Sequence, residues 1–239
     1  MSDLPSTVEI HEEGPREGFQ IEPGPISTVD KVKLIDALSK TGLKHIQACS
    51  FVNPRLVPGW ADAEKVVESF DAHEDVEYTG LYFNGNGLDR ALAFKDKLTI
   101  SGSISLTASE GFTKKNLNRT HAENMAAMER HVMSHLELGI PVNRIGVMAA
   151  FGCNYQGDIS PATVIKTLED GMQIAAKTGA EITLFSLADT MGWAAPHRIE
   201  RVVGDVRNVW PDMTISLHLH DTRGLAIANA YSALKMGVR

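Results

Sequence analysis

Two stretches of this sequence decide its fold class, Ile182-Thr-Leu-Phe-Ser-Leu187 and Thr214-Ile-Ser-Leu-His-Leu219. Each is short, largely apolar and rich in β-branched or bulky side chains, which is typical of a strand buried in a parallel sheet. A segment with helical periodicity separates them. This alternation predicts parallel strands joined by right-handed helical crossovers.

The same alternation extends along the whole chain. Apolar, β-branched runs begin near Thr7, Lys44, Val76, Leu98, Arg144, Glu181 and Met213. They predict seven strand–helix units. A (β/α) barrel and an open doubly wound sheet both fit this order, but the first strand is not followed by the GxGxxG motif of dinucleotide-binding sheets. The nearest approach to that motif is Gly85-Asn86-Gly87.

Two of the connecting helices carry clear start and stop signals. Ser27 can cap the first, with Asp30 three residues later and Gly42 after its end. The inward stripe of that helix is expected to be Val32, Leu34, Ile35 and Leu38. Ser160 can cap the second helix, and Gly179 ends it. The inward residues there are expected to be Val164, Leu168 and Ala175.

Composition excludes several classes of protein. The 239 residues have a net charge of -7, with 43% hydrophobic and 22% charged residues. This is the profile of a folded globular protein without the basic excess that binds nucleic acid. The amino terminus lacks a signal-peptide pattern, no apolar run could cross a membrane, and Cys49 and Cys153 form no CxxC pair. We expect residues 1–239 to form a single cytoplasmic domain with reduced thiols.

Polar residues gather where the predicted strands end. In both candidate folds the loops at the carboxyl ends of the strands converge on one face, where reactive groups are placed. The residues at these positions are Arg16, Glu17 and Gln20 after the first strand, Gln47, Cys49 and Ser50 on the second, Asp189 and Thr190 after the sixth, and His218, His220 and Asp221 on the seventh.

His218 and His220 lie two apart on a predicted strand, so both imidazoles point to the same side and Leu219 points toward the helices. Two imidazoles with one carboxylate make a workable site for a divalent metal ion. Glu17 or Asp221 could supply the oxygen. The alternative is that one histidine is a packed, hydrogen-bonded core residue.

Arg16 is expected in a turn bounded by Gly14 and Gly18, from which its guanidinium could approach a bound oxyanion. A surface arginine is the alternative. Asp189 and Thr190 could equally form a strand-end turn that caps the next helix.

The predicted first strand and the turn after it read Val8-Glu-Ile-His-Glu-Glu-Gly-Pro-Arg-Glu-Gly-Phe-Gln20. This segment resembles the opening motif of the 3-hydroxy-3-methylglutaryl-CoA lyase family of metal-dependent TIM-barrel metallolyases. Further similar segments follow in the family's order: residues 50–58, 109–116, 151–161, 188–192 and 218–224.

The resemblance implies a TIM-type barrel and the retro-Claisen cleavage of a β-hydroxyacyl-CoA with Mg²⁺ or Mn²⁺. His218, His220 and Glu17 match the metal-ligand positions, and Arg16 matches the catalytic arginine that stabilises the thioester enolate. The expected catalytic residues are Arg16, Glu17, Gln47 and Asp189. The expected substrate contacts are Gln20, Ser50, Thr190 and Asp221.

The chain departs from the family pattern in three places. Glu17 stands where the family has aspartate, and its extra methylene moves the carboxylate outward at a site that favours octahedral geometry. Gln47 stands where the lyases have glutamate beside the arginine. The chain ends at Arg239, before the expected eighth strand, asparagine ligand and catalytic-cysteine loop. We therefore expect it to be part of a longer protein.

Coenzyme A would need local positive charge to bind its phosphates. Lys114 and Lys115, on the expected loop after the fourth strand, could provide it, and Phe112 could pack on the pantetheine arm. A solvated helix entrance is the alternative. A homodimer is also an expectation of the resemblance.

Other functions stay open beside cleavage of 3-hydroxy-3-methylglutaryl-CoA. The changes at Glu17 and Gln47 leave room for a related thioester such as citramalyl-CoA. A Claisen-type condensing synthase, a zinc hydrolase and a protein that binds metal and CoA without turnover are the remaining alternatives.

Overall fold

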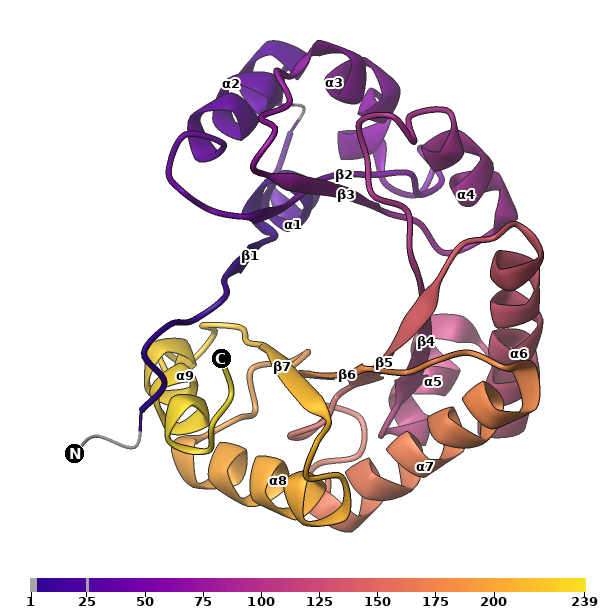
Figure 1. Cartoon of the computed structure of the whole chain (residues 1–239), viewed down its shortest axis with the longest axis vertical. Coiled ribbons are helices and arrows are strands. Elements are labelled where there is room, and N and C mark those ends of the chain that lie inside the picture. Colours follow the sequence, from indigo (N-terminus) through magenta and orange to yellow (C-terminus); the bar gives the residue numbers. More distant parts are fainter. Residues whose placement is uncertain (1–3, 25) are drawn as a thin grey trace. The chain divides into compact units, whose positions relative to one another are not determined.

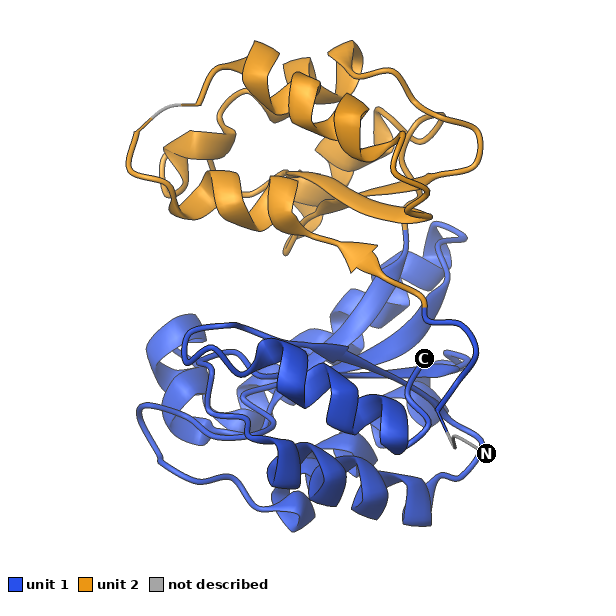
Figure 2. Cartoon of the chain, turned by 90° about the vertical axis from the view of Figure 1, so that its left-hand side faces the viewer, with its two compact units in different colours: residues 1–8, 101–239 blue, residues 9–100 orange. Residues whose placement is uncertain are grey.

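The protein is described by a computed structural model that covers residues 4–24 and 26–239. Its residues form two compact units, an amino-terminal unit of residues 9–100 and a carboxyl-terminal unit of residues 1–8 with 101–239. Figure 2 shows the two units in different colours. The expectation that residues 1–239 form a single domain stays a prediction.

The amino-terminal unit is built on a parallel sheet in the order β1-β2-β3. These strands are β1 (His11–Glu12), β2 (His45–Ser50) and β3 (Glu77–Leu81). Its helices are α1 (Gly14–Ile21), α2 (Thr28–Leu38), α3 (Ala63–Ser69) and α4 (Gly85–Leu92), with the 3₁₀ turn η1 (Pro58–Trp60). Helices α2, α3 and α4 cover one face of the sheet (Figure 1).

The carboxyl-terminal unit has a parallel sheet in the order β4-β5-β6-β7. These strands are β4 (Gly102–Thr107), β5 (Val142–Met148), β6 (Leu184–Ala188) and β7 (Thr214–His218). Its helices are α5 (Glu110–Leu117), α6 (His121–Glu137), α7 (Pro161–Thr178), α8 (Pro196–Val209) and α9 (Ala226–Lys235). The described residues thus contain the seven expected strands, each followed by at least one helix.

The helix signals in the sequence are largely confirmed. The Ser27 hydroxyl accepts the backbone N–H of Asp30 at 3.1 Å, and the Ser160 hydroxyl accepts that of Thr163 at 3.1 Å. Gly179 caps the carboxyl end of α7 at a φ of 81°, a conformation that glycine adopts without steric cost. These local patterns suffice because each cap satisfies backbone groups of its own helix.

The inward face of α2 was predicted incorrectly at one position. Leu34 is exposed, whereas Lys31 is buried at 2% relative exposure. The Lys31 ammonium donates to the Gly59 carbonyl at 2.5 Å and to the Asp62 carboxylate at 2.6 Å. Because these acceptors satisfy its charge, the long lysine stem can occupy a core position that hydrophobic patterning would assign to leucine.

Each unit has its own apolar core. In the amino-terminal unit the core includes Ile35, Ala48, Trp60 and Phe70. In the carboxyl-terminal unit it includes Ile145, Leu168, Phe185 and Val203. Cys49 and Cys153 are both buried free thiols, as expected. Burial raises the pKa of Cys49 far above its ordinary value, so this thiol remains protonated.

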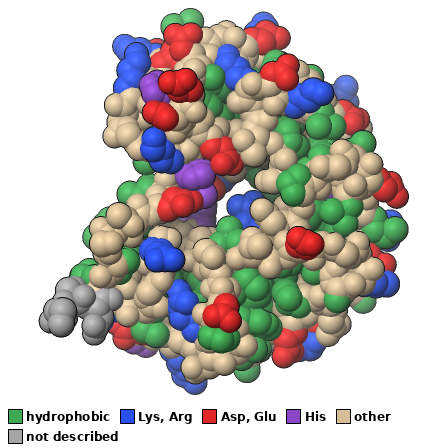
Figure 3. Space-filling view, in the orientation of Figure 1, with side chains coloured by type: hydrophobic (Ala, Val, Ile, Leu, Met, Phe, Trp, Pro, Cys, Tyr) green, Lys and Arg blue, Asp and Glu red, His purple; other side chains and the backbone are tan. Residues whose placement is uncertain are grey.

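The charged side chains on the surface include both signs, as the composition of the sequence predicts. Acidic and basic side chains are interspersed on the face shown in Figure 3. Among the described helices, none combines the length and apolar character needed to span a bilayer.

Candidate active site

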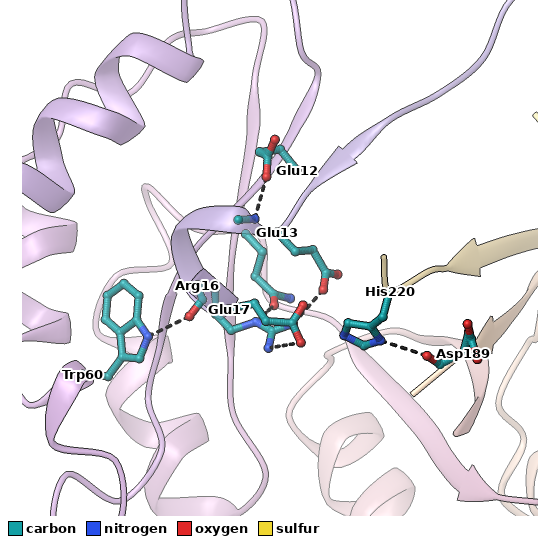
Figure 4. A network of polar contacts seen from close by, with 9 residues as sticks. Glu12, Glu13, Arg16, Glu17, Trp60, Asp189 and His220 are labelled. Carbon is teal, nitrogen blue, oxygen red and sulfur yellow. Dashed lines mark hydrogen bonds and ion pairs between the residues drawn. The ribbon is translucent and has the colours of Figure 1, made fainter. Parts of the chain in front are cut away.

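Arg16 lies on helix α1, which follows β1 directly (Figure 4). The sequence-based expectation of a glycine-bounded turn is therefore wrong. Pro15 stands in the first turn of α1, where its fixed φ favours helix initiation and its missing N–H costs no hydrogen bond. As a result Gly14 begins the helix, and Arg16 and Glu17 both lie near its amino end.

The Arg16 guanidinium is held on three sides by side chains of the amino-terminal unit (Figure 4). Its Nε donates to Gln47 Oε1, and its Nη2 donates to Glu13 Oε2 at 2.6 Å. Its Nη1 lies 3.6 Å from Glu17 Oε1. The side chain of Arg16 is only 12% exposed. The geometry therefore fixes a charged guanidinium beside Gln47, as the sequence suggested, in place of a mobile surface arginine.

Sequence analysis missed Glu13 and Trp60 as partners of Arg16. Trp60 Nε1 donates to the Arg16 backbone carbonyl at 2.9 Å. Glu13 precedes Arg16 by three residues, a spacing that could have indicated the ion pair if the helix had been foreseen. Trp60 is distant in sequence, and no local pattern points to it.

The other two candidates of this unit differ in environment. Ser50 is fully buried at the carboxyl end of β2, and its Oγ has no hydrogen-bond partner among the described residues. An unsatisfied hydroxyl is costly to bury, so this group is suited to a polar ligand. Gln20 is exposed on α1.

His218 and His220 are adjacent in the carboxyl-terminal unit. His218 ends β7, and the two ring centroids lie 4.8 Å apart at an interplanar angle of 61°. Leu219 packs against the core, as predicted. His220 Nδ1 donates to the Asp189 carbonyl at 2.9 Å (Figure 4). This hydrogen bond sets the tautomer of the neutral ring, with its lone pair on Nε2, which is how metal-ligating histidines are commonly oriented.

Asp189 holds the turn that follows β6. One of its carboxylate oxygens accepts the backbone N–H groups of Trp193 at 2.7 Å and Ala194 at 3.0 Å. Its second carboxylate oxygen is buried without a hydrogen-bond partner among the described residues. Burial raises the pKa of Asp189, although both amide hydrogen bonds oppose the shift. Asp189 thus holds a strand-end turn, as expected, but it does not cap the next helix, because α8 begins at Pro196 without a side-chain cap. A buried acceptor remains.

Thr190 and Asp221 also support the backbone. Thr190 Oγ1 accepts the N–H of Ala149 at 2.9 Å, and Ala149 has a positive φ of 55°. Asp221 Oδ1 accepts the N–H of Ala226 at 2.9 Å, at the start of α9. Both side chains therefore hold loops at the carboxyl ends of strands in this unit.

The candidate CoA-binding residues lie on a helix, so their expected placement on a loop is wrong. Ser109 caps α5 by accepting the N–H of Phe112 at 3.1 Å, which starts the helix directly after β4. The Phe112 ring stacks on Tyr155 with centroids 6.4 Å apart. Lys114 and Lys115 are exposed in the last turn of α5.

Comparisons with known proteins agree on one family. The family model described as HMGL-like matches residues 7–239. Hydroxymethylglutaryl-CoA lyase YngG of Bacillus subtilis is 35% identical over 98% of this chain and 75% of its own length. The human mitochondrial hydroxymethylglutaryl-CoA lyase is 36% identical over 100% of this chain and 70% of its own length.

Solved structures give the same result. The hydroxymethylglutaryl-CoA lyase of Pseudomonas aeruginosa matches with a TM-score of 0.87 and 30% identity, over 99% of this chain and 76% of that one. An HMG-CoA lyase of Acinetobacter baumannii, solved with coenzyme A and 3-methylmalate, matches with a TM-score of 0.82 and 32% identity, over 100% and 75% of the two chains. These matches confirm the expected fold class, the α/β barrel of the lyases.

Proposed function

We infer the activity of this protein from one premise, that the chain belongs to the HMGL-like family. On that premise we propose that it is a divalent-metal-dependent lyase that cleaves 3-hydroxy-3-methylglutaryl-CoA to acetyl-CoA and acetoacetate. The observation that carries the proposal is the 35% identity to a hydroxymethylglutaryl-CoA lyase over 98% of the chain. The guanidinium of Arg16, held by Gln47 and Glu13, supports it.

In this reaction the tertiary hydroxyl of the substrate loses its proton, and the carbinol carbon becomes the ketone of acetoacetate. The bond between that carbon and the α-carbon of the thioester breaks, and its electron pair forms the thioester enolate. The enolate then takes up a proton at carbon to give acetyl-CoA. Negative charge thus moves from the hydroxyl oxygen to the thioester oxygen, and catalysis requires groups that stabilise it at both places.

Arg16 is proposed to stabilise the enolate oxygen. Its Nε and Nη2 are engaged by Gln47 and Glu13, so the orientation of the guanidinium is set before substrate binds. A donor that is already oriented needs little reorganisation as charge develops. Gln47 accepts from Arg16 without carrying a negative charge, which leaves more of the guanidinium charge for the substrate than a glutamate would.

His218, His220 and Glu17 are proposed as the protein ligands of Mg²⁺ or Mn²⁺. The donor set fits, because the hydrogen bond to the Asp189 carbonyl favours the neutral tautomer of His220 whose Nε2 carries the lone pair, and Mn²⁺ accepts both imidazole and carboxylate ligands. When bound, the ion would make the hydroxyl proton of the substrate easier to remove. The inclusion of Glu17 rests on the sequence match.

The remaining candidates are proposed to bind substrate. The unsatisfied Ser50 hydroxyl and the buried second oxygen of Asp189 are polar groups that gain hydrogen bonds when a polar ligand binds. Gln20, Thr190 and Asp221 are further substrate contacts in this proposal. Phe112, Lys114 and Lys115 on α5 would bind CoA, with the ammonium groups near its phosphates. A cytoplasmic location and a homodimer stay predictions, and relatives named cytoplasmic and mitochondrial both occur.

A second substrate is favoured by one specific observation. Gln47 gives Arg16 a neutral partner, where the resemblance to the lyases predicts glutamate. The altered charge would suit a related thioester such as citramalyl-CoA, whose cleavage by the same bond changes gives acetyl-CoA and pyruvate.

The test is to incubate the purified protein with each thioester and Mg²⁺ or Mn²⁺ and to identify the products by mass spectrometry. We expect acetyl-CoA with acetoacetate from the first substrate, and loss of product in Arg16→Gln but not in Arg130→Gln, which changes an exposed arginine on α6. Metal-dependent cleavage of citramalyl-CoA alone would select the second substrate. Release of free CoA from acetyl-CoA and a keto acid would indicate a synthase, and binding without any turnover would overturn the lyase proposal.

A further inference from the structure

A second group of histidine and glutamate side chains lies in the amino-terminal unit, at the amino ends of the strands. His11 begins β1, His45 begins β2, and the two residues are partners in the parallel ladder. Glu9 precedes β1, and Glu77 begins β3 next to His45. The proposed lyase reaction uses none of these four side chains.

The nitrogen and oxygen atoms of this group converge. His11 Nε2 lies 2.6 Å from Glu9 Oε1, and His45 Nε2 lies 3.2 Å from the same oxygen. The ligand atoms of these three residues all lie within 4.8 Å of one another. The two rings stack with centroids 4.2 Å apart and an interplanar angle of 5°. Parallel strands at this register therefore place both imidazoles side by side, facing one carboxylate.

Glu77 adds a fourth contact on the opposite side of the His45 ring. Its Oε2 lies 3.4 Å from His45 Nδ1. A carboxylate on Nδ1 favours the tautomer whose Nε2 carries the lone pair, and in metal proteins such a carboxylate both orients the ring and raises its basicity. In His45 the Nε2 atom is the one nearer Glu9, and Nδ1 is the one nearer Glu77. With a metal ion bound, Nε2 would therefore be the ligand atom and Nδ1 would face the supporting carboxylate.

We propose that Glu9, His11 and His45 bind a divalent transition-metal ion of the zinc type, with Glu77 as the supporting carboxylate. Zn²⁺ binds imidazole nitrogen and carboxylate oxygen at about 2.0–2.2 Å, which places ligand atoms of a tetrahedral site about 3.3 Å apart. The 3.2 Å separation of His45 Nε2 and Glu9 Oε1 matches this spacing. His11 Nε2 and Glu9 Oε1, now 2.6 Å apart, would have to separate by about 0.7 Å to reach this spacing as the ion replaces the proton between them.

The donor set fits this class of ion. Two imidazoles and one carboxylate are ligands that Zn²⁺, Co²⁺ and Ni²⁺ bind. Glu9 and His11 are exposed, so a fourth position is open to water or to a small ligand. The ion would also stabilise the position of β1 beside β2. Among the described residues these two strands pair at two positions, His11–His45 and Glu12–Ile46. This site shares no residue with the proposed catalytic ligands His218, His220 and Glu17.

The alternative occupant of this space is a proton. Glu9 has a lowered pKa, chiefly through the hydrogen bond from His11, and a protonated imidazole would hold the same three side chains together. A metal site takes up added Zn²⁺ or Co²⁺, whereas a protonated histidine pair does not. A metal titration therefore distinguishes the two cases.

The experiment is a titration of the full chain with Zn²⁺ by calorimetry, and with Co²⁺ by visible absorption. It is carried out in a protein bearing His218→Ala and His220→Ala, so that the proposed catalytic site does not contribute. We expect a single ion to bind with imidazole-type Co²⁺ bands and to raise the unfolding temperature. His11→Gln and His45→Gln should each abolish this binding, and Glu77→Gln should weaken it roughly 10- to 100-fold.

His73→Gln is the matched control, because His73 is an exposed histidine of the same unit outside the cluster. It should bind the ions with unchanged affinity. Circular dichroism checks that each variant is folded. Absence of Zn²⁺ binding in the folded double variant, or equal binding after His11→Gln and His45→Gln, would overturn the proposal and leave the proton as the occupant. Neither result bears on the lyase activity.

Discussion

Trp60 holds the backbone of Arg16: its indole N–H donates to the Arg16 carbonyl at 2.9 Å, although 44 residues separate the two in sequence. Trp60 is fully buried, and the Lys31 ammonium lies 4.8 Å from the centroid of its ring. A core residue of the amino-terminal unit thus positions the helix that carries the proposed catalytic guanidinium.

Trp60→Phe should lower kcat while leaving KM nearly unchanged. The phenyl ring fills much of the core space, but the hydrogen bond to α1, worth about 1 kcal/mol, is lost and Arg16 becomes less well placed. Steady-state kinetics of thioester cleavage measure the effect, which we expect to be about 3- to 30-fold. Trp210→Phe, in the other unit, is the control, and an unchanged kcat in Trp60→Phe would exclude a positioning role.

Arg16→Lys should reduce the rate of cleavage by roughly 10²- to 10³-fold, the usual effect of removing one donor to a developing oxyanion. Lysine keeps the charge but cannot make the two directed hydrogen bonds to Gln47 and Glu13. Single-turnover kinetics with saturating substrate measure the step itself. Activity within a factor of two of the unaltered protein would contradict the assignment.

His218→Ala and His220→Ala should each abolish Mn²⁺ binding while leaving the fold intact. Each substitution removes one of the two proposed imidazole ligands, and His220→Ala removes the ring that the Asp189 carbonyl orients. Electron paramagnetic resonance of Mn²⁺ measures the bound fraction, in a background carrying His45→Gln so that the second cluster does not contribute. His197→Ala, at an exposed histidine, should bind normally, and equal binding in all three variants would refute the ligand assignment.

Glu17→Asp should strengthen Mg²⁺ and Mn²⁺ binding several-fold. The shorter side chain restores the aspartate of the family motif, and these small ions favour direct ligation in a compact site. It also moves the carboxylate away from Arg16 Nη1, now 3.6 Å distant. Calorimetric titration gives both affinities, and weaker binding in the variant would mean that this site is adapted to the longer glutamate.

Acid should destabilise the carboxyl-terminal unit through His131 of α6. Burial lowers the pKa of His131 from 6.5 to about 4, with a further contribution from His135. Because the unfolded chain binds this proton more readily, the contribution to stability is full above pH 6.5 and is lost as the pH falls through 6.5 toward 4.

His131→Gln should flatten this part of the stability–pH profile. The ring is only partly buried, so we expect a difference of roughly 1–2 kcal/mol in the free energy of unfolding between pH 7 and pH 4. Urea denaturation at a series of pH values measures it. A parallel decline in both proteins would show that other groups control acid stability.

Much of the fold was predictable because its signals are local. The cap at Ser160 and the glycine at residue 179 act on backbone groups of α7 itself, so sequence alone located that helix. The alternation of buried strands with helices predicted seven parallel strands. The proximity of His218 and His220 was also predictable from their spacing of two residues, although β7 ends at His218 and His220 lies beyond the strand.

Other features were not predictable from local patterns. Lys31 is buried because Gly59 and Asp62, far along the chain, supply its acceptors. The turn expected at Arg16 is a helix, since the proline signal there outweighed its flanking glycines. Glu13 became a partner of Arg16 only as a consequence of that helix.

By itself the sequence determined the order and parallel sense of the strands, the helix ends and the family to which the chain belongs. All of these depend on residue types at short spacings, which act through local backbone preferences and periodic burial. Only the tertiary structure decided which distant groups meet: Gln47 and Trp60 at Arg16, Asp189 at His220, and Glu9 with His11 and His45. Such contacts depend on strand register and on which buried polar groups find partners, and neither is encoded in a local spacing.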